Sequence, residues 1–403
     1  MYYYEFKKIL NNKTSYFILM LGFVLIFIWS LIFVGRNYDT SLNGFYRDIN
    51  GTLTKEKQET LEDEYKKAYS EVFTETDEGM VFQNESMELS GKYCDNRFED
   101  FCALTEMDAL INLIKKRESY LKSNQIKKAE IGEEAYHKYF DDEEEHVICN
   151  RNLIPILIDN QFPILIGISI MIILCAGCLI LEEKNHTSLI LATTKYGYQN
   201  NIACKMRIVF LLSIMIQIIL NFEYYLICMI RFPISKWELI APLFYAKGFE
   251  LCPGNYTVVK YIIFELLAGI ITTFFFSMFT IALSCLLKRK ILSIVISEIC
   301  FAISIAINII YDYLYHGAYT TDSEYIISTY AFGKFYEIWR LINPFAFVQL
   351  KYYFEQPRFL ITDTFVIDKY LIPLLIVCLF IILFDLFTKK KYQFARRVLT
   401  GYE

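Results

Sequence analysis

The chain has 403 residues, of which 55% are hydrophobic and 17% aromatic. This apolar share exceeds the roughly 45–50% of an ordinary soluble domain, and the charged residues are concentrated between long apolar runs. The composition therefore excludes a soluble protein and indicates a polytopic membrane protein. The formal net charge of −5 excludes little, because it adds charges from opposite sides of a membrane.

The chain begins with a surface segment and a membrane anchor. Residues 1–14 can place Tyr2, Phe6 and Ile9 on one helical face with lysines off it, which predicts an amphipathic helix at the membrane interface. A disordered basic start is the alternative. Residues 15–34 are apolar over more than the roughly 7–15-residue core of a signal peptide, and no cleavage site follows, so they predict transmembrane helix 1.

Residues 35–161 differ from the rest of the chain. Between residues 36 and 160 there are 28 acidic and 16 basic side chains, with no long apolar run before Leu153. Residues 58–73 and 106–128 carry apolar side chains at helical spacing. The segment therefore predicts a mainly helical extracytoplasmic domain, inserted between transmembrane helices 1 and 2.

Five further apolar runs complete the predicted fold. Each can cross a hydrocarbon core of roughly 30 Å as a helix, and they cover residues 162–181, 208–229, 259–287, 291–315 and 370–388. Basic clusters lie at the ends that the positive-inside rule assigns to the cytoplasm. The sequence thus predicts an all-α, multi-pass protein of the cell membrane with six transmembrane helices, helices 2–6 lying within residues 162–403, and both termini cytoplasmic.

Two connections between these helices are more than simple loops. Residues 182–206 form a long polar elbow on the predicted cytoplasmic side, which we interpret as a docking handle for a cytoplasmic partner. Residues 316–370 are aromatic, carry charges at intervals too short for a span, and are interrupted by Asn343-Pro344. We predict that they form an extracellular re-entrant segment.

Motifs for catalysis and nucleotide binding are absent from the sequence. It has no G-x-x-x-x-G-K-[ST], H-E-x-x-H or G-x-S-x-G pattern, and its four histidines are scattered. We therefore predict no catalytic residues, no metal site and no cofactor in this chain. The basic clusters lie beside membrane spans, which favours membrane lipid over nucleic acid as a partner.

Three carboxylates fall inside predicted spans, where an ionisable group is costly and often functional. They are Glu223, Glu265 and Glu298. They can line a route for a cationic or amphipathic cargo or relay protons. Alternatively, each pairs with a neighbouring helix or reaches the interface, which is the favoured interpretation for Glu265 because it lies only about 9 Å from the start of its span.

Four of the eleven cysteines lie in regions that we place outside the membrane, where disulfides are permitted. They are Cys94, Cys102, Cys149 and Cys252. Three pairings are possible, and the sequence does not select one.

The elbow combines an acidic pair, a Thr- and Ser-rich step, a glycine and a lysine: Glu182, Glu183, Thr187, Thr194, Tyr196, Gly197 and Lys205. In this order of residues it resembles the elbow of a known family, the membrane subunit of type-2 ABC exporters (ABC-2-type permeases). The amphipathic start, the insertion after the first span and the aromatic Asn343-Pro344-Phe345 segment are also similar to that family, whereas His186 stands where the family usually has glycine.

The resemblance implies a partner-driven transporter. A separate ATPase subunit dimer, with ATP and Mg²⁺, would dock on the elbow residues, and a second permease chain, identical or related, would complete the transport path. The cargo would be a peptide, a lipid or another amphipathic molecule. By analogy alone, the large insertion suggests antimicrobial-peptide export or self-protection.

Two other classes remain open. The chain can be a membrane receptor or scaffold that senses an extracellular ligand through residues 35–161, although six spans exceed what an anchor needs. It can also be a membrane enzyme that acts on lipid or peptide, although no convergent set of His, Asp, Glu or Cys residues supports this.

Overall fold

The computed structural model describes most of the helical parts of the chain. The described residues are 7, 13–36, 50–76, 79–82, 104, 105, 107–115, 146–158, 161–176, 197–232, 234–246, 249, 252, 256–319, 339, 342–348, 350, 353, 354, 358–362, 365–368 and 370–400. This part of the molecule is mostly helical, as the sequence predicts.

Among the described residues, six helical segments are long and apolar enough to cross a membrane, which confirms the predicted number and indicates a membrane protein. The second segment is assembled from the 3₁₀ turn η1 (Arg151–Leu153), α9 (Ile154–Ile158) and α10. The six long helices are α2 (Lys13–Arg36), α10 (Phe162–Cys175), α13 (Gly197–Arg231), α15 (Val258–Leu287), α16 (Lys290–Tyr319) and α19 (Leu371–Thr400).

Two helices extend beyond the apolar runs that predict them. The helix α13 begins at Gly197, so the last ten residues of the expected elbow, 197–206, are the foot of this helix. No proline or further glycine interrupts residues 198–231, so nothing breaks the helical backbone there. Likewise, α19 continues to Thr400 through the basic tail.

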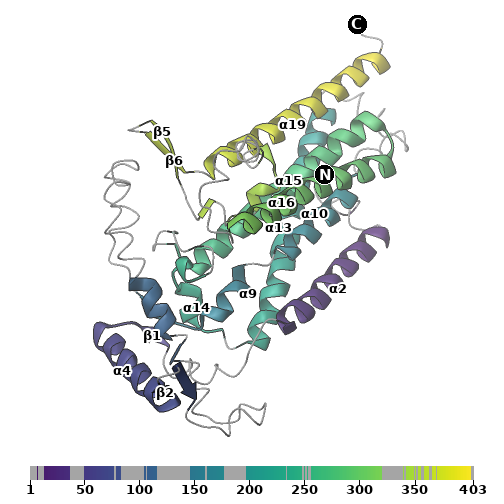
Figure 1. The fold of residues 1–403 in the computed structure, drawn as a ribbon. Helices are drawn as coiled ribbons and strands as arrows, with labels where there is room; N and C mark the ends of the chain where they lie inside the picture. The colour runs from purple at the N-terminus through teal and green to yellow at the C-terminus, as the bar shows by residue number, and fades with distance from the viewer. Residues whose placement is uncertain are drawn as a thin grey trace.

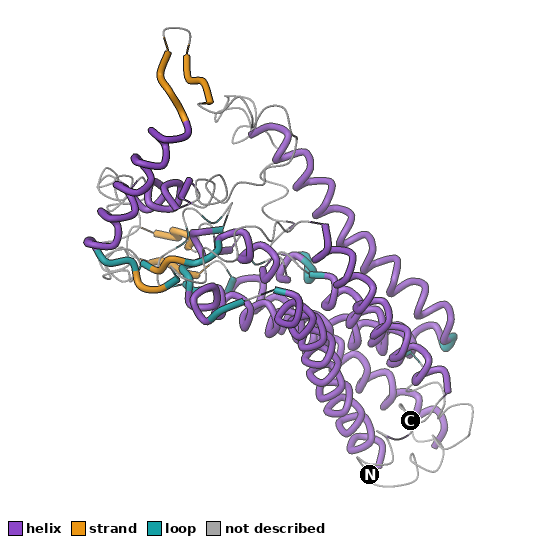
Figure 2. The backbone as a smooth tube through the Cα atoms, turned by 90° about the horizontal axis from the view of Figure 1, so that it is seen from below, coloured by secondary structure: helices purple, strands orange, loops and turns teal. Residues whose placement is uncertain are grey.

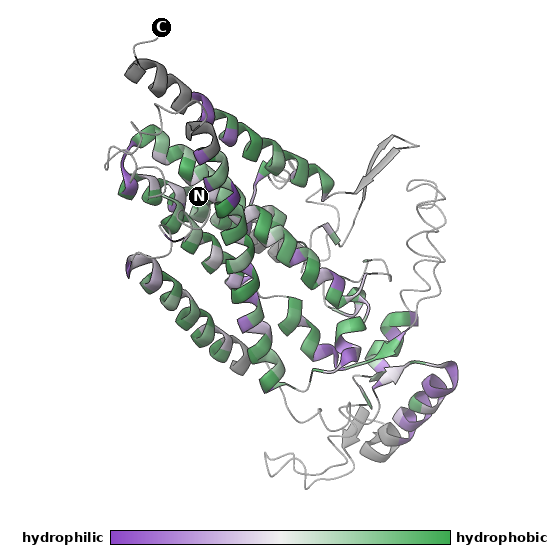
Figure 3. Ribbon diagram, turned by 180° about the vertical axis from the view of Figure 1, so that it is seen from behind, coloured by the Kyte–Doolittle hydropathy of each residue, from purple (hydrophilic) through white to green (hydrophobic). Residues whose placement is uncertain are grey.

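The helix α15 lies at the centre of the bundle. It packs against α10, α13, α16 and α19, whereas α2 packs on α10 and α13. One end of the bundle, here called the foot end, carries the turn between α15 and α16 and the end of α19; the other, the cap end, carries α9 and α14 (Lys236–Ile240) (Figures 1 and 2). Apolar residues cover nearly the whole length of these helices (Figure 3).

The described elements between the first two spans are partly helical and partly extended. The helix α4 (Lys55–Val72) matches the expected helix 58–73, and residues 107–115 are helical within the expected 106–128. Two short antiparallel pairs were not predicted: β1 (Gly51–Thr52) with β4 (Val147–Ile148), and β2 (Phe73–Thr76) with β3 (Gly79–Phe82).

The elements between the first two spans carry polar and charged side chains on their surface. Exposed polar residues cover most of α4 (Figure 3). A Lys115–Glu62 ion pair of 2.7 Å joins segment 107–115 to α4, and the hydrogen bond from Lys115 lowers the pKa of Glu62. The strand pair β1–β4 brings together the beginning and the end of the region between the first two spans.

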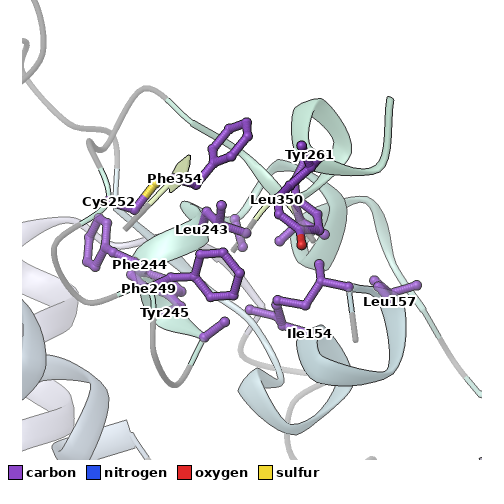
Figure 4. Close-up of a cluster of buried hydrophobic side chains, with 14 of the residues drawn as sticks. Ile154, Leu157, Leu243, Phe244, Tyr245, Phe249, Cys252, Tyr261, Leu350 and Phe354 are labelled. Atoms are coloured by element: carbon purple, nitrogen blue, oxygen red, sulfur yellow. The ribbon is translucent and has the colours of Figure 1, made fainter. Parts of the chain in front are cut away.

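An apolar cluster, here called the cap cluster, fills the cap end (Figure 4). It joins α9, the turn η2 (Leu243–Tyr245), the beginning of α15 and residues 347–354. Aromatic rings dominate it, with edge-to-face pairs such as Phe249–Tyr261 and Tyr256–Phe354. Leu110, Ile114, Val147 and Cys149 from the region between the first two spans also belong to the cluster, which therefore joins that region to the same end of the bundle.

Parts of residues 316–370 insert into the bundle. The turn η3 (Ala346–Val348) packs on α15 and α16, and Phe345 and Val348 are buried among side chains of α10, α15, α16 and α19. These contacts place an irregular segment against the spans; its re-entrant character stays a prediction. An antiparallel strand pair, β5 (Arg358–Thr362) with β6 (Phe365–Asp368), follows it and was not predicted.

Candidate functional site: polar contacts inside the bundle

The most developed polar site in the bundle lies where α10, α13 and α15 meet. Gln217 of α13 is fully buried; its amide nitrogen donates to the carbonyl oxygen of Ile164 at 3.2 Å and to the hydroxyl of Thr273 at 2.6 Å. Its amide oxygen accepts from Asn221 at 3.2 Å. One side chain therefore bonds to both neighbouring helices, in a region where an unsatisfied polar group is costly. We call Gln217, Asn221 and Thr273 the polar layer.

A glycine makes room for this contact. A Cβ atom added at Gly167 of α10 would overlap the amide nitrogen of Gln217. Gly269 of α15 lies similarly close to Ile164, where an added Cβ would sit 3.1 Å from the isoleucine side chain. Small residues at both positions thus let the three helices approach closely enough for the amide to bridge them.

Two more hydrogen bonds connect helices toward the foot end. The hydroxyl groups of Thr280 on α15 and Ser297 on α16 are 2.9 Å apart. Ser284 of α15 donates to the carbonyl oxygen of Ala176, the residue that follows α10, at 3.2 Å. The central helix is therefore linked by side-chain hydrogen bonds to α10, α13 and α16.

Glu298, one of the three predicted intramembrane carboxylates, forms a hydrogen bond to a neighbouring helix. It lies on α16 and accepts a 3.2 Å hydrogen bond from the hydroxyl of Ser169 on α10. Its other oxygen, Oε1, is buried without a hydrogen bond. The contact links α10 to α16 but leaves half of the carboxylate unsatisfied.

The other two carboxylates lie elsewhere. Glu265 is buried near the cap end of α15, where it interacts electrostatically with Tyr225 of α13. Helical rise places its level roughly 20 Å from that of Glu298 along the α15–α16 pair. Glu223 is half-buried on α13, and its Oε2 is buried without a hydrogen bond. The three predicted positions therefore do not form one cluster.

Asn343, in the segment predicted to be re-entrant, forms hydrogen bonds to the bundle. Its side-chain amide donates to the carbonyl oxygen of Ser304 at 3.0 Å and to Asn308 at 3.3 Å, both on α16. The next residue, Pro344, accepts through its carbonyl oxygen from Thr272 of α15 at 3.3 Å. The Asn-Pro pair thus bridges α15 and α16 at the point where Phe345 enters the core.

A buried carboxylate that the sequence reasoning missed lies at the cap end. Glu238 of α14 is only 1% exposed. It accepts from the backbone of Asn150 at 3.2 Å, from the side chain of Asn50 at 3.5 Å, and from the backbone, at 2.7 Å, and hydroxyl of Ser235. The S-x-x-E spacing of Ser235 and Glu238 is a capping box, a signal that was available in the sequence.

Further contacts hold the chain between β4 and α10. The guanidinium of Arg151 donates twice to the carbonyl oxygen of Tyr245, at 3.1 and 3.2 Å. Tyr224 and Tyr225 of α13 donate to the carbonyl oxygens of Ile156 and Leu157 at 2.6 and 3.3 Å. This segment is therefore fixed both to the cap cluster and to α13.

The predicted docking residues are only partly within the described residues. Glu182, Glu183, Thr187, Thr194 and Tyr196 lie outside them, as does almost all of residues 1–14. Gly197 is the first residue of α13, and the side chain of Lys205, in the foot of the same helix, is buried. The docking role of all seven stays a prediction.

Two of the four candidate disulfide cysteines can be placed. Cys149 and Cys252 are both buried in the cap cluster, and no disulfide joins them. Burial raises the pKa of the Cys149 thiol, which disfavours the reactive thiolate. Cys94 and Cys102 lie outside the described residues. Among the described residues, no group of three or more His, Cys, Asp or Glu side chains is placed to hold a metal ion.

Comparison with known proteins adds no family assignment. No family model, no curated protein and no solved structure matches this chain.

Proposed function

We propose that this chain is the transmembrane subunit of an ATP-driven exporter and is moved by a separate ATPase subunit. The observation that supports this most directly is the form of α13. It is one uninterrupted helix of 35 residues, about 50 Å long, whose foot contains the end of the elbow. A helix of this length can carry a displacement from one side of a membrane of roughly 30 Å to the other.

The polar layer supports the same mechanism. Because Gln217 bonds to both α10 and α15, a force on the foot of α13 would reach all three helices. Asn343 and Thr272 would pass it from α15 and α16 to the re-entrant segment. Such a bundle, with two packings biased by a partner at one end, is a known design for switching proteins.

The proposed topology follows from charge. Basic clusters at the foot end, such as Lys288 to Lys290 and Lys389 to Lys391, support the assignment of that end, with both termini, to the cytoplasm. The cap end and residues 35–161 would then face outward as an extracytoplasmic domain. ATP and Mg²⁺ would bind the partner ATPase dimer, and a second permease chain would complete the path for a peptide, lipid or other amphipathic cargo.

Partner capture tests the proposal. The tagged chain is purified in mild detergent, and co-purifying proteins are identified and quantified by mass spectrometry. We expect a stoichiometric protein with a Walker-type sequence, lost when Glu182 and Glu183 are both changed to alanine. The matched control is Glu56→Ala together with Glu59→Ala on α4, two exposed carboxylates at the opposite end, which should retain the ATPase.

Other outcomes contradict the proposal. A chain that purifies alone, or with a kinase and no ATPase, would favour the receptor or scaffold alternative. In that case the region between the first two spans would be the sensing part.

A further inference from the structure

Glu298 occupies an unusual position for a carboxylate. It lies eight residues from Lys290 within the candidate span Lys290–Ile310, which puts it about 12 Å from the beginning of that span. It sits at the border of two faces of α16: Ser297 is buried against α15, whereas Ile299 is exposed on the apolar surface of the bundle. The carboxylate is therefore half-buried at a lateral edge of the bundle, within the segment that is apolar enough to span a membrane.

The chain supplies little to balance this charge. Among the described residues, Glu298 accepts one hydrogen bond, from the neutral hydroxyl of Ser169, and its Oε1 is buried with no donor among them. No cationic side chain among the described residues pairs with it. By contrast, Asp385 in α19 forms an ion pair with Lys389 one turn away in the same helix.

This difference has an energetic consequence. An ionised carboxylate in a hydrocarbon environment costs several kcal/mol unless a cation or several donors compensate it. One hydroxyl does not provide that compensation. A mobile cation that enters from the membrane would therefore gain more at Glu298 than at any carboxylate already paired within the chain.

The surroundings of Glu298 are apolar and partly open. On α16, Ile294 lies one turn away and is half-buried; on α10, Leu165 and Ile173 lie one turn to either side of Ser169 and are also half-buried. A ligand in this position would contact aliphatic side chains on two helices. Its chemistry would combine an apolar body with one positive charge.

We propose that Glu298 and Ser169 form a binding site for lipophilic cations at the seam between α10 and α16. The cationic group sits against the carboxylate, and the apolar body lies along the half-exposed residues of both helices. That such a cation is the exported cargo rests on the proposed function; the binding itself does not require it. The cargo class is thereby narrowed from amphipathic molecules in general to cationic ones.

The probe is tetraphenylphosphonium, compared with tetraphenylborate, an anion of the same size and shape. Equilibrium binding of each ion is measured on the full chain in phosphatidylcholine nanodiscs, with empty nanodiscs to subtract partitioning into lipid. We expect saturable binding of the cation and none of the anion. Glu298→Gln, which keeps the shape and an acceptor for Ser169, should weaken cation binding at least tenfold.

Two variants separate a local site from a general charge effect. Glu223→Gln removes another half-buried carboxylate, on α13, and should leave cation binding within twofold of the unchanged chain. Ser169→Ala removes the hydroxyl that holds the carboxylate but retains the charge, so it should weaken cation binding less than Glu298→Gln does. If Glu223→Gln and Glu298→Gln weaken tetraphenylphosphonium binding equally, the net charge of the chain, and not the seam between α10 and α16, attracts the ion.

Three results would overturn the proposal: no saturable binding of the cation, equal binding of cation and anion, or unchanged binding in Glu298→Gln. The assay needs no ATPase, so its failure is distinguishable from failure of the exporter proposal. If the chain binds the cation specifically but captures no ATPase, Glu298 is still a cation-binding site, but it is not a cargo site of an ATP-driven exporter.

Discussion

Two carboxylates in this molecule, Glu238 at the cap end and Glu298 in the bundle, differ in how the chain satisfies them. Glu238 is almost fully buried and accepts hydrogen bonds from three residues, Asn50, Asn150 and Ser235. Glu298 is half-buried and accepts one. The first joins the beginning and the end of the region between the first two spans to α14, whereas the second joins only two neighbouring helices.

The comparison separates a structural carboxylate from one available to a ligand. A buried acceptor with several donors stabilises the fold, and its loss leaves those donors unsatisfied. An acceptor with one neutral donor contributes little to the fold, and its remaining capacity is open. Burial alone does not distinguish the two groups; the number and kind of donors does.

The largest expected effect is at Glu238. Replacing it with alanine removes the capping box and leaves the backbone N–H of Asn150 without its acceptor, so the free energy of unfolding should fall by roughly 3 kcal/mol. Thermal unfolding in detergent measures this. Glu59→Ala, an exposed change on α4, is the control and should shift stability by less than about 0.5 kcal/mol. Equal stability of the two variants would show that the Glu238 contacts are not structural.

The next effect concerns the polar layer. Gly167→Ala pushes a Cβ into the Gln217 amide, and we expect a loss of about 2 kcal/mol by overpacking. Gln217→Ala removes the side chain that the new Cβ meets. In a double-mutant cycle, Gln217→Ala should therefore lower the free energy of unfolding less in the Gly167→Ala background than in the unchanged chain, by about 1 kcal/mol or more.

A second glycine provides the control for that cycle. Gly269→Ala meets Ile164 and not Gln217, so Gln217→Ala should not relieve it. The free energies of unfolding of the single and double variants are measured. If the losses from Gly167→Ala and Gln217→Ala simply add, the polar layer does not depend on the close approach of α10.

A smaller effect is expected at Ser297. Its hydroxyl lies 2.9 Å from that of Thr280 on the neighbouring helix, and hydrogen bonds between membrane helices average about 0.6 kcal/mol. Ser297→Ala should therefore lower the free energy of unfolding by roughly that amount. Ser293→Ala removes a hydroxyl that donates to the carbonyl oxygen of Arg289, the residue just before α16, and should lower the free energy of unfolding by less. The reverse order would contradict the role of Ser297 in linking α15 to α16.

The six spans could be predicted from sequence because each is a local apolar run, and a run of that length has few alternatives to a spanning helix. The foot of α13 was assigned to a connection instead, because residues 197–206 are polar and hydropathy does not register a helix that continues past an apolar run. The capping-box spacing at Ser235 and Glu238 was readable but was not used.

The polar layer could not be predicted in the same way. Gln217, Ile164 and Thr273 come from three helices, and their proximity depends on packing that no local pattern encodes. The search for ionisable residues found Glu298 but passed over uncharged Gln217. The two unexpected strand pairs in residues 51–82 and 147–148 are likewise set by pairing partners and not by strong β-type runs.

The smallest expected change in stability is at Glu298, and it tests the comparison most sharply. Glu298→Gln keeps an acceptor for Ser169 and removes a poorly compensated charge, so stability should change by less than about 0.5 kcal/mol or rise slightly. Thermal unfolding under the conditions used for the Glu238 variants measures it. A loss near that of Glu238→Ala would show that Glu298 is a structural contact whose charge the bundle needs. An unchanged fold that no longer binds a lipophilic cation would assign the carboxylate to the ligand, because the fold and the binding would then depend on different groups.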